Sequence, residues 1–133
     1  MTVARDACGR ASEANWRTAA NRAYYGTMLE IRDAFTRWGL SVPPPAVVHT
    51  LVLQRLFTSK DGDMKLVGRM LDDLRRLRRL ADYETGVVWQ FASKAEALGA
   101  VRRAEKALAL FDAIDADASR RSTILAEIQA VHP

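Results

Sequence analysis

The chain has 133 residues, a formal net charge of +4 and a single cysteine, Cys8. This length fits one domain with a real core, and one cysteine excludes an internal disulfide and argues against a zinc site. No apolar run is long enough to cross a membrane, and the N-terminus lacks the apolar run of a signal peptide, so we expect a cytoplasmic protein. We also expect no metal and no cofactor. The mild positive charge permits RNA or another acidic partner but does not require one.

Glycine and proline are few, which favours helices, and the first long helix is predicted from about Glu13 to Trp38. Ser12 is its expected N-cap and Gly39 ends it. One helical stripe carries its core side chains, namely Trp16, Ala20, Tyr24, Thr27, Met28, Ile31, Phe35 and Trp38. The apolar arc is broad and Gly26 permits close helix contact, so we expect a homodimer with two-fold symmetry.

After a proline-rich loop, periodicity predicts three more main helices and a short last one, at about Pro45–Phe57, Asp63–Tyr83, Ser93–Ile114 and Ser119–Val131. Continuation of the third helix to Gln90 stays open, because Gly86 and bulky residues interrupt the pattern. The predicted fold is all-α, an up-and-down bundle of four main helices plus a short C-terminal helix, in a single domain over 1–133.

The end of the third predicted helix carries an unusual pattern. At 100° per residue, one apolar arc of roughly 120° contains Val67, Met70, Leu71, Leu74, Leu77 and Ala81. Arg78 falls inside this arc, Asp82 sits at its edge one turn later, and Arg75 lies beside both. Because an unpaired buried charge is costly, the pattern indicates either a structural ion pair between Arg78 and Asp82 or a functional site.

Standard chemical motifs are scarce in the sequence. It has no glycine-rich phosphate loop, no metal-ligand cluster and no recognisable serine-nucleophile motif. Its two histidines, His49 and His132, are far apart, and a lone histidine such as His49 is more often a capping or packing residue than a catalyst. A helix-turn-helix DNA reader is disfavoured, because no recognition helix rich in Asn, Gln, Ser and Arg follows a tight turn.

Three elements together resemble the small free-standing HEPN proteins, the higher-eukaryote-and-prokaryote nucleotide-binding domains. They are Asn21-Arg22-Ala23-Tyr24-Tyr25 in the first helix, His49 early in the second, and Arg78-x-x-Ala81-Asp82-Tyr83 ending the third. The similarity extends over most of the chain, from about Ser12 to Ile114. It implies a helical bundle that dimerises through its long helices, often as the toxin of a toxin–antitoxin or defence system with a minimal nucleotidyltransferase as partner.

Active HEPN proteins are metal-independent ribonucleases that use an arginine followed, after four to six residues, by a histidine. This sequence departs from that motif, because neither histidine has an arginine at the required distance. Asp82 is a poor base beside arginine, so any cleavage would depend on Arg78 and His49 as the catalytic pair.

Binding of RNA or a nucleotide is the function that the resemblance favours. The expected groove is lined by Arg22, Tyr25, Arg75, Asp82 and Tyr83, in addition to the Arg78–His49 pair. Arginine would hold a phosphate in bidentate fashion and tyrosine would stack on a base. The alternative is a non-catalytic interaction module that docks a partner protein, in which the Arg78–Asp82 pair is purely structural.

Overall fold

The computed structural model describes residues 13–83 and 94–131, with side chains over 18–79 and 97–131. Its elements are α2 (Glu13–Arg37), the 3-10 turn η1 (Pro45–Val47), α3 (Val48–Thr58), α4 (Gly62–Tyr83), α5 (Lys94–Ala116) and α6 (Ala118–Val131). The all-α prediction is confirmed, and the helix bounds agree to within a few residues. The Ser12 cap and the extension to Gln90 lie outside the described residues, as does the Trp16 side chain.

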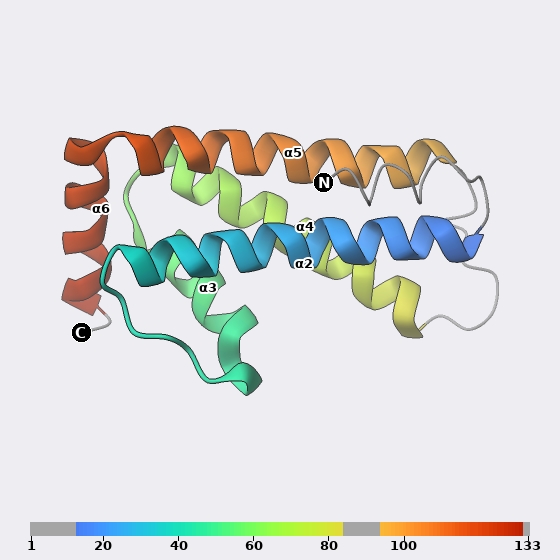
Figure 1. The fold of residues 1–133 in the computed structure, drawn as a ribbon, viewed down its shortest axis with the longest axis horizontal. Coiled ribbons are helices and arrows are strands. Elements are labelled where there is room, and N and C mark those ends of the chain that lie inside the picture. Colours follow the sequence, from blue (N-terminus) through green and yellow to red (C-terminus); the bar gives the residue numbers. More distant parts are fainter. Residues whose placement is uncertain (1–12, 84–93, 132–133) are drawn as a thin grey trace.

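Three long helices form the body of the bundle (Figure 1). α2 and α5 lie side by side and run in the same direction, while α4 runs the opposite way and packs against both. α6 crosses one end of the bundle and contacts α3 and α5. The predicted short helix is α6, which at 14 residues is longer than the 11-residue α3. Among these helices, none combines the length and the apolar run that a bilayer crossing needs.

The core follows the predicted stripe of α2. Six members of that stripe are buried, namely Ala20, Tyr24, Thr27, Met28, Ile31 and Phe35. The Phe35 ring meets the edge of the Phe111 ring on α5, with centroids 5.7 Å apart, and Trp38 stacks on Phe111 at 5.6 Å. The Trp38 indole Nε1 donates to Asp115 Oδ1 at 2.7 Å, which satisfies its polar atom. Aromatic packing therefore joins the C-terminal halves of α2 and α5.

α3 and the turn before it bury only part of their apolar side chains. Val48, Val52, Leu53 and Leu56 are buried, whereas Val47 and Phe57 are 46% and 40% exposed. The Phe57 ring lies over Gly68 of α4, where a Cβ atom would come within 3.0 Å of its carbons. Gly68 therefore lets α4 approach α3 and seats the Phe57 ring at the surface between them.

The turn between α3 and α4 is fixed by a carboxylate and by α6. Asp61 Oδ1 accepts hydrogen bonds from the backbone N–H groups of Asp63 and Met64 at 2.9 and 3.2 Å, and so caps α4. Arg120 of α6 donates through Nε to Asp61 Oδ2 at 2.6 Å and through Nη2 to Asp63 Oδ2 at 2.8 Å. This contact, the Arg120 clamp, holds α6 against the start of α4, and its hydrogen bonds are the main cause that lowers the pKa of Asp61.

We expect Asp61→Ala to lower the free energy of unfolding by about 2 kcal/mol at neutral pH, because the cap and the Arg120 clamp are both lost. Since folding lowers the pKa of Asp61, this stabilisation is present above the ordinary carboxyl pKa and is lost as pH falls through the folded-state pKa. Urea unfolding at several pH values measures both effects. The control is Asp72→Ala, which removes an exposed pair with Arg76 and should cost less than about 0.5 kcal/mol. Equal losses in the two variants would contradict the role of the cap.

Candidate functional site

Five side chains from three helices lie together on one side of the bundle; four are predicted site residues and the fifth is Tyr24. They are Tyr24 and Tyr25 of α2, His49 of α3, and Arg75 and Arg78 of α4, and we call them the basic–aromatic cluster. Adjacent tyrosines on α2 point to different neighbours, because successive helical residues are turned by about 100°. Tyr24 is therefore fully buried, while Tyr25 is 36% exposed.

Arg78 is drawn toward the core, as its position in the apolar arc predicted. Its guanidinium carbon lies 5.1 Å from the centroid of the Tyr25 ring and 5.6 Å from that of Tyr24. Its Nη1 donates a hydrogen bond to the Tyr25 hydroxyl. These contacts hold the guanidinium in a cation–π arrangement, which costs arginine less solvation than burial among aliphatic side chains. The side chain of Asp82 lies outside the described residues, so its pairing with Arg78 stays a prediction.

His49 is bound to Tyr24 through a short hydrogen bond. The Tyr24 hydroxyl lies 2.5 Å from His49 Nδ1, and the two rings are stacked with centroids 5.5 Å apart. Burial raises the pKa of Tyr24 to about 12, against the opposing effect of Arg75 and Arg78. Burial, and then the same two arginines, lowers the pKa of His49 below its usual value. At neutral pH both groups are therefore uncharged.

The Tyr24 contact decides which nitrogen of His49 carries the proton. A buried phenol that stays protonated needs an acceptor, and His49 Nδ1 fills that role. We therefore assign the proton of the imidazole to Nε2, which is then a hydrogen-bond donor. A ring in this state can donate a hydrogen bond from Nε2 to an anion. Its only unprotonated nitrogen, Nδ1, already accepts the hydrogen bond from Tyr24. The geometry thus suits His49 for binding better than for proton abstraction.

We expect Arg75→Ala to raise the pKa of His49 toward 6.5, because one of the two charges that oppose imidazole protonation is removed. NMR titration of the imidazole ring protons, assigned with His49→Gln, measures the change. The matched control is Arg102→Ala, which removes an equal charge from the exposed face of α5. Because the folded state lowers this pKa, the unfolded chain binds the proton more readily, and stability should fall as pH drops below about 6.5. An unchanged His49 pKa in Arg75→Ala would show that the two groups do not interact.

The remaining predicted site residues are less well placed. Arg22 is exposed on α2, three residues before Tyr25 and so on the same flank of the helix, but no described contact joins it to the cluster. Asp82 and Tyr83 end α4, and their side chains lie outside the described residues. Of the seven predicted site residues, the structure therefore brings Arg78, His49, Tyr25 and Arg75 together.

A surface hollow of about 410 Å³ adjoins the cluster, and the sequence analysis did not predict it. It is lined by Thr50, Leu53, Gln54, Phe57 and Thr58 of α3 and by Arg75 of α4. Arg75 belongs to both the hollow and the cluster, so the two are continuous. A signal was present in the sequence, because Thr50, Gln54 and Thr58 recur at four-residue spacing and form a polar stripe on the second predicted helix.

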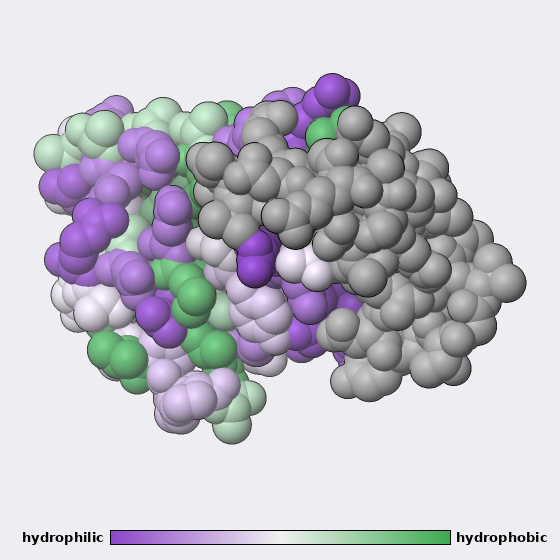
Figure 2. All heavy atoms as spheres, turned by 45° about the vertical axis from the view of Figure 1, so that its right-hand side comes forward, coloured by the Kyte–Doolittle hydropathy of each residue, from purple (hydrophilic) through white to green (hydrophobic). Residues whose placement is uncertain are grey.

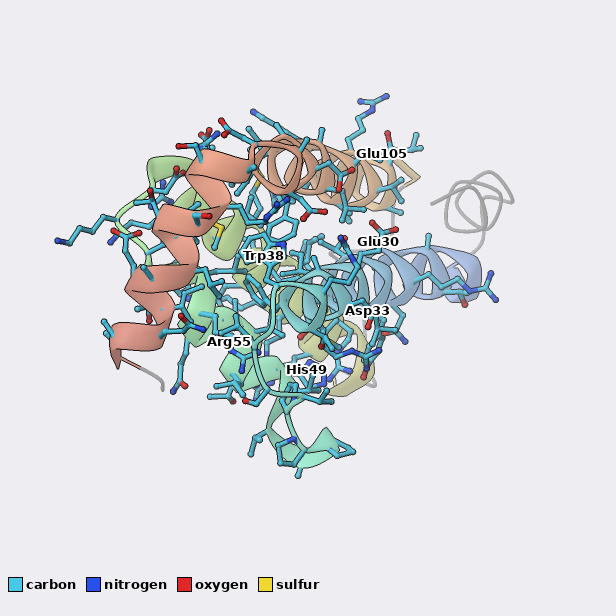
Figure 3. All side chains as sticks on the ribbon, turned by 60° about the vertical axis from the view of Figure 1, so that its left-hand side comes forward. Glu30, Asp33, Trp38, His49, Arg55 and Glu105 are labelled. Carbon is cyan, nitrogen blue, oxygen red and sulfur yellow. The ribbon has the colours of Figure 1, made fainter. Side chains whose placement is uncertain are left out.

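The opposite side of α2 carries a different kind of surface. A smaller hollow of about 250 Å³ is lined there by Glu30, Asp33, Ala34, Arg37, Phe111 and Asp112. Figure 3 shows Glu30 on the side of α2 that faces α5, which carries Glu105, while His49 of α3 lies on the other side of α2. Within 13–83 and 94–131, no three His, Cys, Asp or Glu side chains are grouped to hold a metal ion.

Comparisons of the chain with protein-family models, with curated proteins and with solved structures each gave no match. Function is therefore inferred from the chemistry of the basic–aromatic cluster and from the residues that resemble HEPN proteins.

Proposed function

We propose that this protein binds RNA or a nucleotide through the basic–aromatic cluster, as a HEPN-like component of a prokaryotic toxin–antitoxin or defence pair. The observation that carries the proposal is that Arg78 contacts Tyr25, whose ring meets that of His49, while Arg75 lines the adjoining hollow. Arg75 is half-buried and makes no ion pair with a carboxylate in the part of the chain that the structure describes. A cation kept without an acidic partner is available for an anionic ligand.

The cluster supplies the groups that a phosphate and a base require. Arginine presents several N–H donors in a planar fork that matches phosphate oxygens, and His49 Nε2 adds a further donor. Stacking on Tyr24 and Tyr25 restricts the Arg78 guanidinium before any ligand arrives, which reduces the entropy lost on binding. Tyr25, which is partly exposed, offers a ring face for a base.

Arg75→Ala and Arg78→Ala should each weaken binding of labelled single-stranded RNA by about tenfold, measured by fluorescence anisotropy. Each variant should also reduce the slope of log affinity against log salt by about 0.7, since one phosphate contact is lost. Arg102→Ala, with the same change in net charge, controls for general electrostatics and should bind almost as the wild type does. Equal weakening in all three variants would point to non-specific attraction and would overturn the proposal.

The assembly and partner predicted from the sequence belong to this proposal. Support for a homodimer through the first helix comes from Leu29, a large apolar side chain that is 37% exposed on α2. A minimal nucleotidyltransferase partner and weak metal-independent ribonuclease activity follow from the HEPN resemblance alone.

The alternative, a non-catalytic module that docks a partner protein, has its own supporting observation. Val42 and Val47 are 67% and 46% exposed in and beside the segment that leads into α3. Figure 2 shows hydrophobic spheres gathered in the lower part of the described face, at the height where Figure 1 places this segment. Absence of RNA and nucleotide binding, together with loss of a partner protein in Val42→Asp, would favour this alternative.

A further inference from the structure

We propose that the hollow along α3 is a nucleobase pocket, occupied by one unstacked base whose phosphate lies at Arg75. This inference rests on the proposed function and deepens it, because it assigns the base and the phosphate to separate, adjoining places. The base can belong to a free mononucleotide or to single-stranded RNA, since both present the same ring and phosphate.

The size and lining of the hollow suit a flat heterocycle. Its volume of about 410 Å³ lies within the range of small-molecule sites. Leu53, which is 8% exposed, and Phe57, which is 40% exposed, give it an apolar surface with an aromatic ring. Gln54 and Thr50 add polar groups, and a glutamine amide both donates and accepts hydrogen bonds, as the edge of a base does. Aromatic stacking combined with a polar edge is how proteins hold single unpaired bases.

The Phe57 ring is positioned before a ligand binds. Its edge carbons lie against Gly68, and any larger residue there would force the ring outward. The hollow thus has an aromatic ring on one side, with its edge packed against α4.

Charge favours a nucleotide over an uncharged peptide or an apolar side chain. Arg75 lines the hollow and also acts on His49 and Tyr24, so a positive potential begins where the apolar lining ends. Arg78, which contacts Tyr25, adds a second positive charge in the same cluster. A ligand with a flat apolar part joined to an anionic group matches this order, and a nucleoside monophosphate has that construction.

The test compares AMP, CMP, GMP and UMP with ribose 5-phosphate, which keeps the sugar and phosphate but lacks the base. Binding is followed by NMR titration of the labelled protein. The wild type should bind the best nucleotide about tenfold more tightly than ribose 5-phosphate, in line with the contribution of one stacked base. Phe57→Leu should bring this ratio close to one, while Gln54→Ala should change the preference among the four bases. Arg75→Ala should weaken nucleotides and ribose 5-phosphate by the same factor, because it removes only the phosphate contact.

Two controls keep the outcome clear. Gln129→Ala, on the exposed face of α6, should leave every affinity unchanged, and circular dichroism melting checks that Phe57→Leu is folded. Gln54 is exposed, so its variant tests the pocket even if Phe57→Leu does not fold. A single-stranded RNA hexamer that binds much more tightly than AMP identifies RNA as the source of the base, and equal affinities identify a free nucleotide.

The experiment distinguishes failure of the base pocket from failure of the proposed function. Arg75-dependent binding of ribose 5-phosphate as tight as that of every nucleotide would overturn the base pocket and leave phosphate binding in place. No binding of nucleotides, ribose 5-phosphate or RNA would overturn both.

Discussion

Arg55→Ala is expected to lower the free energy of unfolding by about 3–5 kcal/mol, whereas Arg55→Met should change it by less than about 1.5 kcal/mol. Arg55 is only 3% exposed, and burial lowers its pKa. Its Nη2 donates to the Ser41 carbonyl at 3.0 Å and to the Ser41 hydroxyl at 3.1 Å, and its guanidinium lies 5.9 Å from the centroid of the Phe35 ring. Figure 3 shows the side chain directed from α3 into the bundle.

The contrast between the two variants separates packing from charge. Among the described side chains, no carboxylate pairs with Arg55, and its Nε and Nη1 make no hydrogen bond. Removing the long stem creates a cavity, while methionine fills most of the same volume and carries no charge to desolvate. Urea denaturation with an unchanged m-value gives the two free energies. Equal large losses in both variants would instead assign the stabilisation to the hydrogen bonds with Ser41.

Purified protein is expected to cleave labelled RNA slowly or not at all, with or without EDTA. The reason is the state of His49: Nδ1, its only unprotonated ring nitrogen, accepts the hydrogen bond from Tyr24, and the remaining Nε2 carries a proton and cannot act as a base. Any authentic cleavage should fall by about 100-fold or more in His49→Ala, because a general base contributes at least that factor. Arg78→Ala should have a comparable effect, because Arg78 is the other member of the predicted catalytic pair.

The experiment incubates wild type, His49→Ala and Arg78→Ala with labelled RNA and follows the products on a denaturing gel. Arg102→Ala loses the same charge as Arg78→Ala and controls for general electrostatics. Cleavage that is equal in all of the samples would come from a contaminating nuclease. Rapid EDTA-resistant cleavage that persists in His49→Ala would remove His49 from the mechanism. Intact RNA in every sample, together with Arg75-dependent binding, would identify a binding protein.

Periodicity in the sequence was sufficient for the fold because each helix is defined by local spacing. The core stripe of α2 and the inward position of Arg78 both follow from residues within one helix. Arg55, like Arg78, is a charged residue within an apolar arc, because it falls at helical spacing from Val48 and Val52. The same arc analysis of the second helix predicts its inward position.

Contacts between helices could not be predicted in this way. The hydrogen bond from Tyr24 to His49 joins residues 25 apart, and that between Arg78 and Tyr25 joins residues 53 apart. Periodicity says which face of a helix is buried but not which side chain of another helix it meets. The hollow beside Arg75 was missed for the same reason, because it depends on the close approach of α3 to Gly68.

The Arg120 clamp joins residues that are far apart in the sequence, so it can form only after α6 has been synthesised. Arg120 leaves the ribosome 59 residues after Asp61, so the paired carboxylates of the α3–α4 turn emerge long before their cation. The contacts that α2, α4 and α5 make with one another do not involve α6, so this part of the chain can pack before α6 docks. Until α6 arrives, the surface that receives Ile124 and Ile128 is open to chaperones and to other nascent chains. Docking of α6 then buries Ile124 and Ile128 and covers this surface.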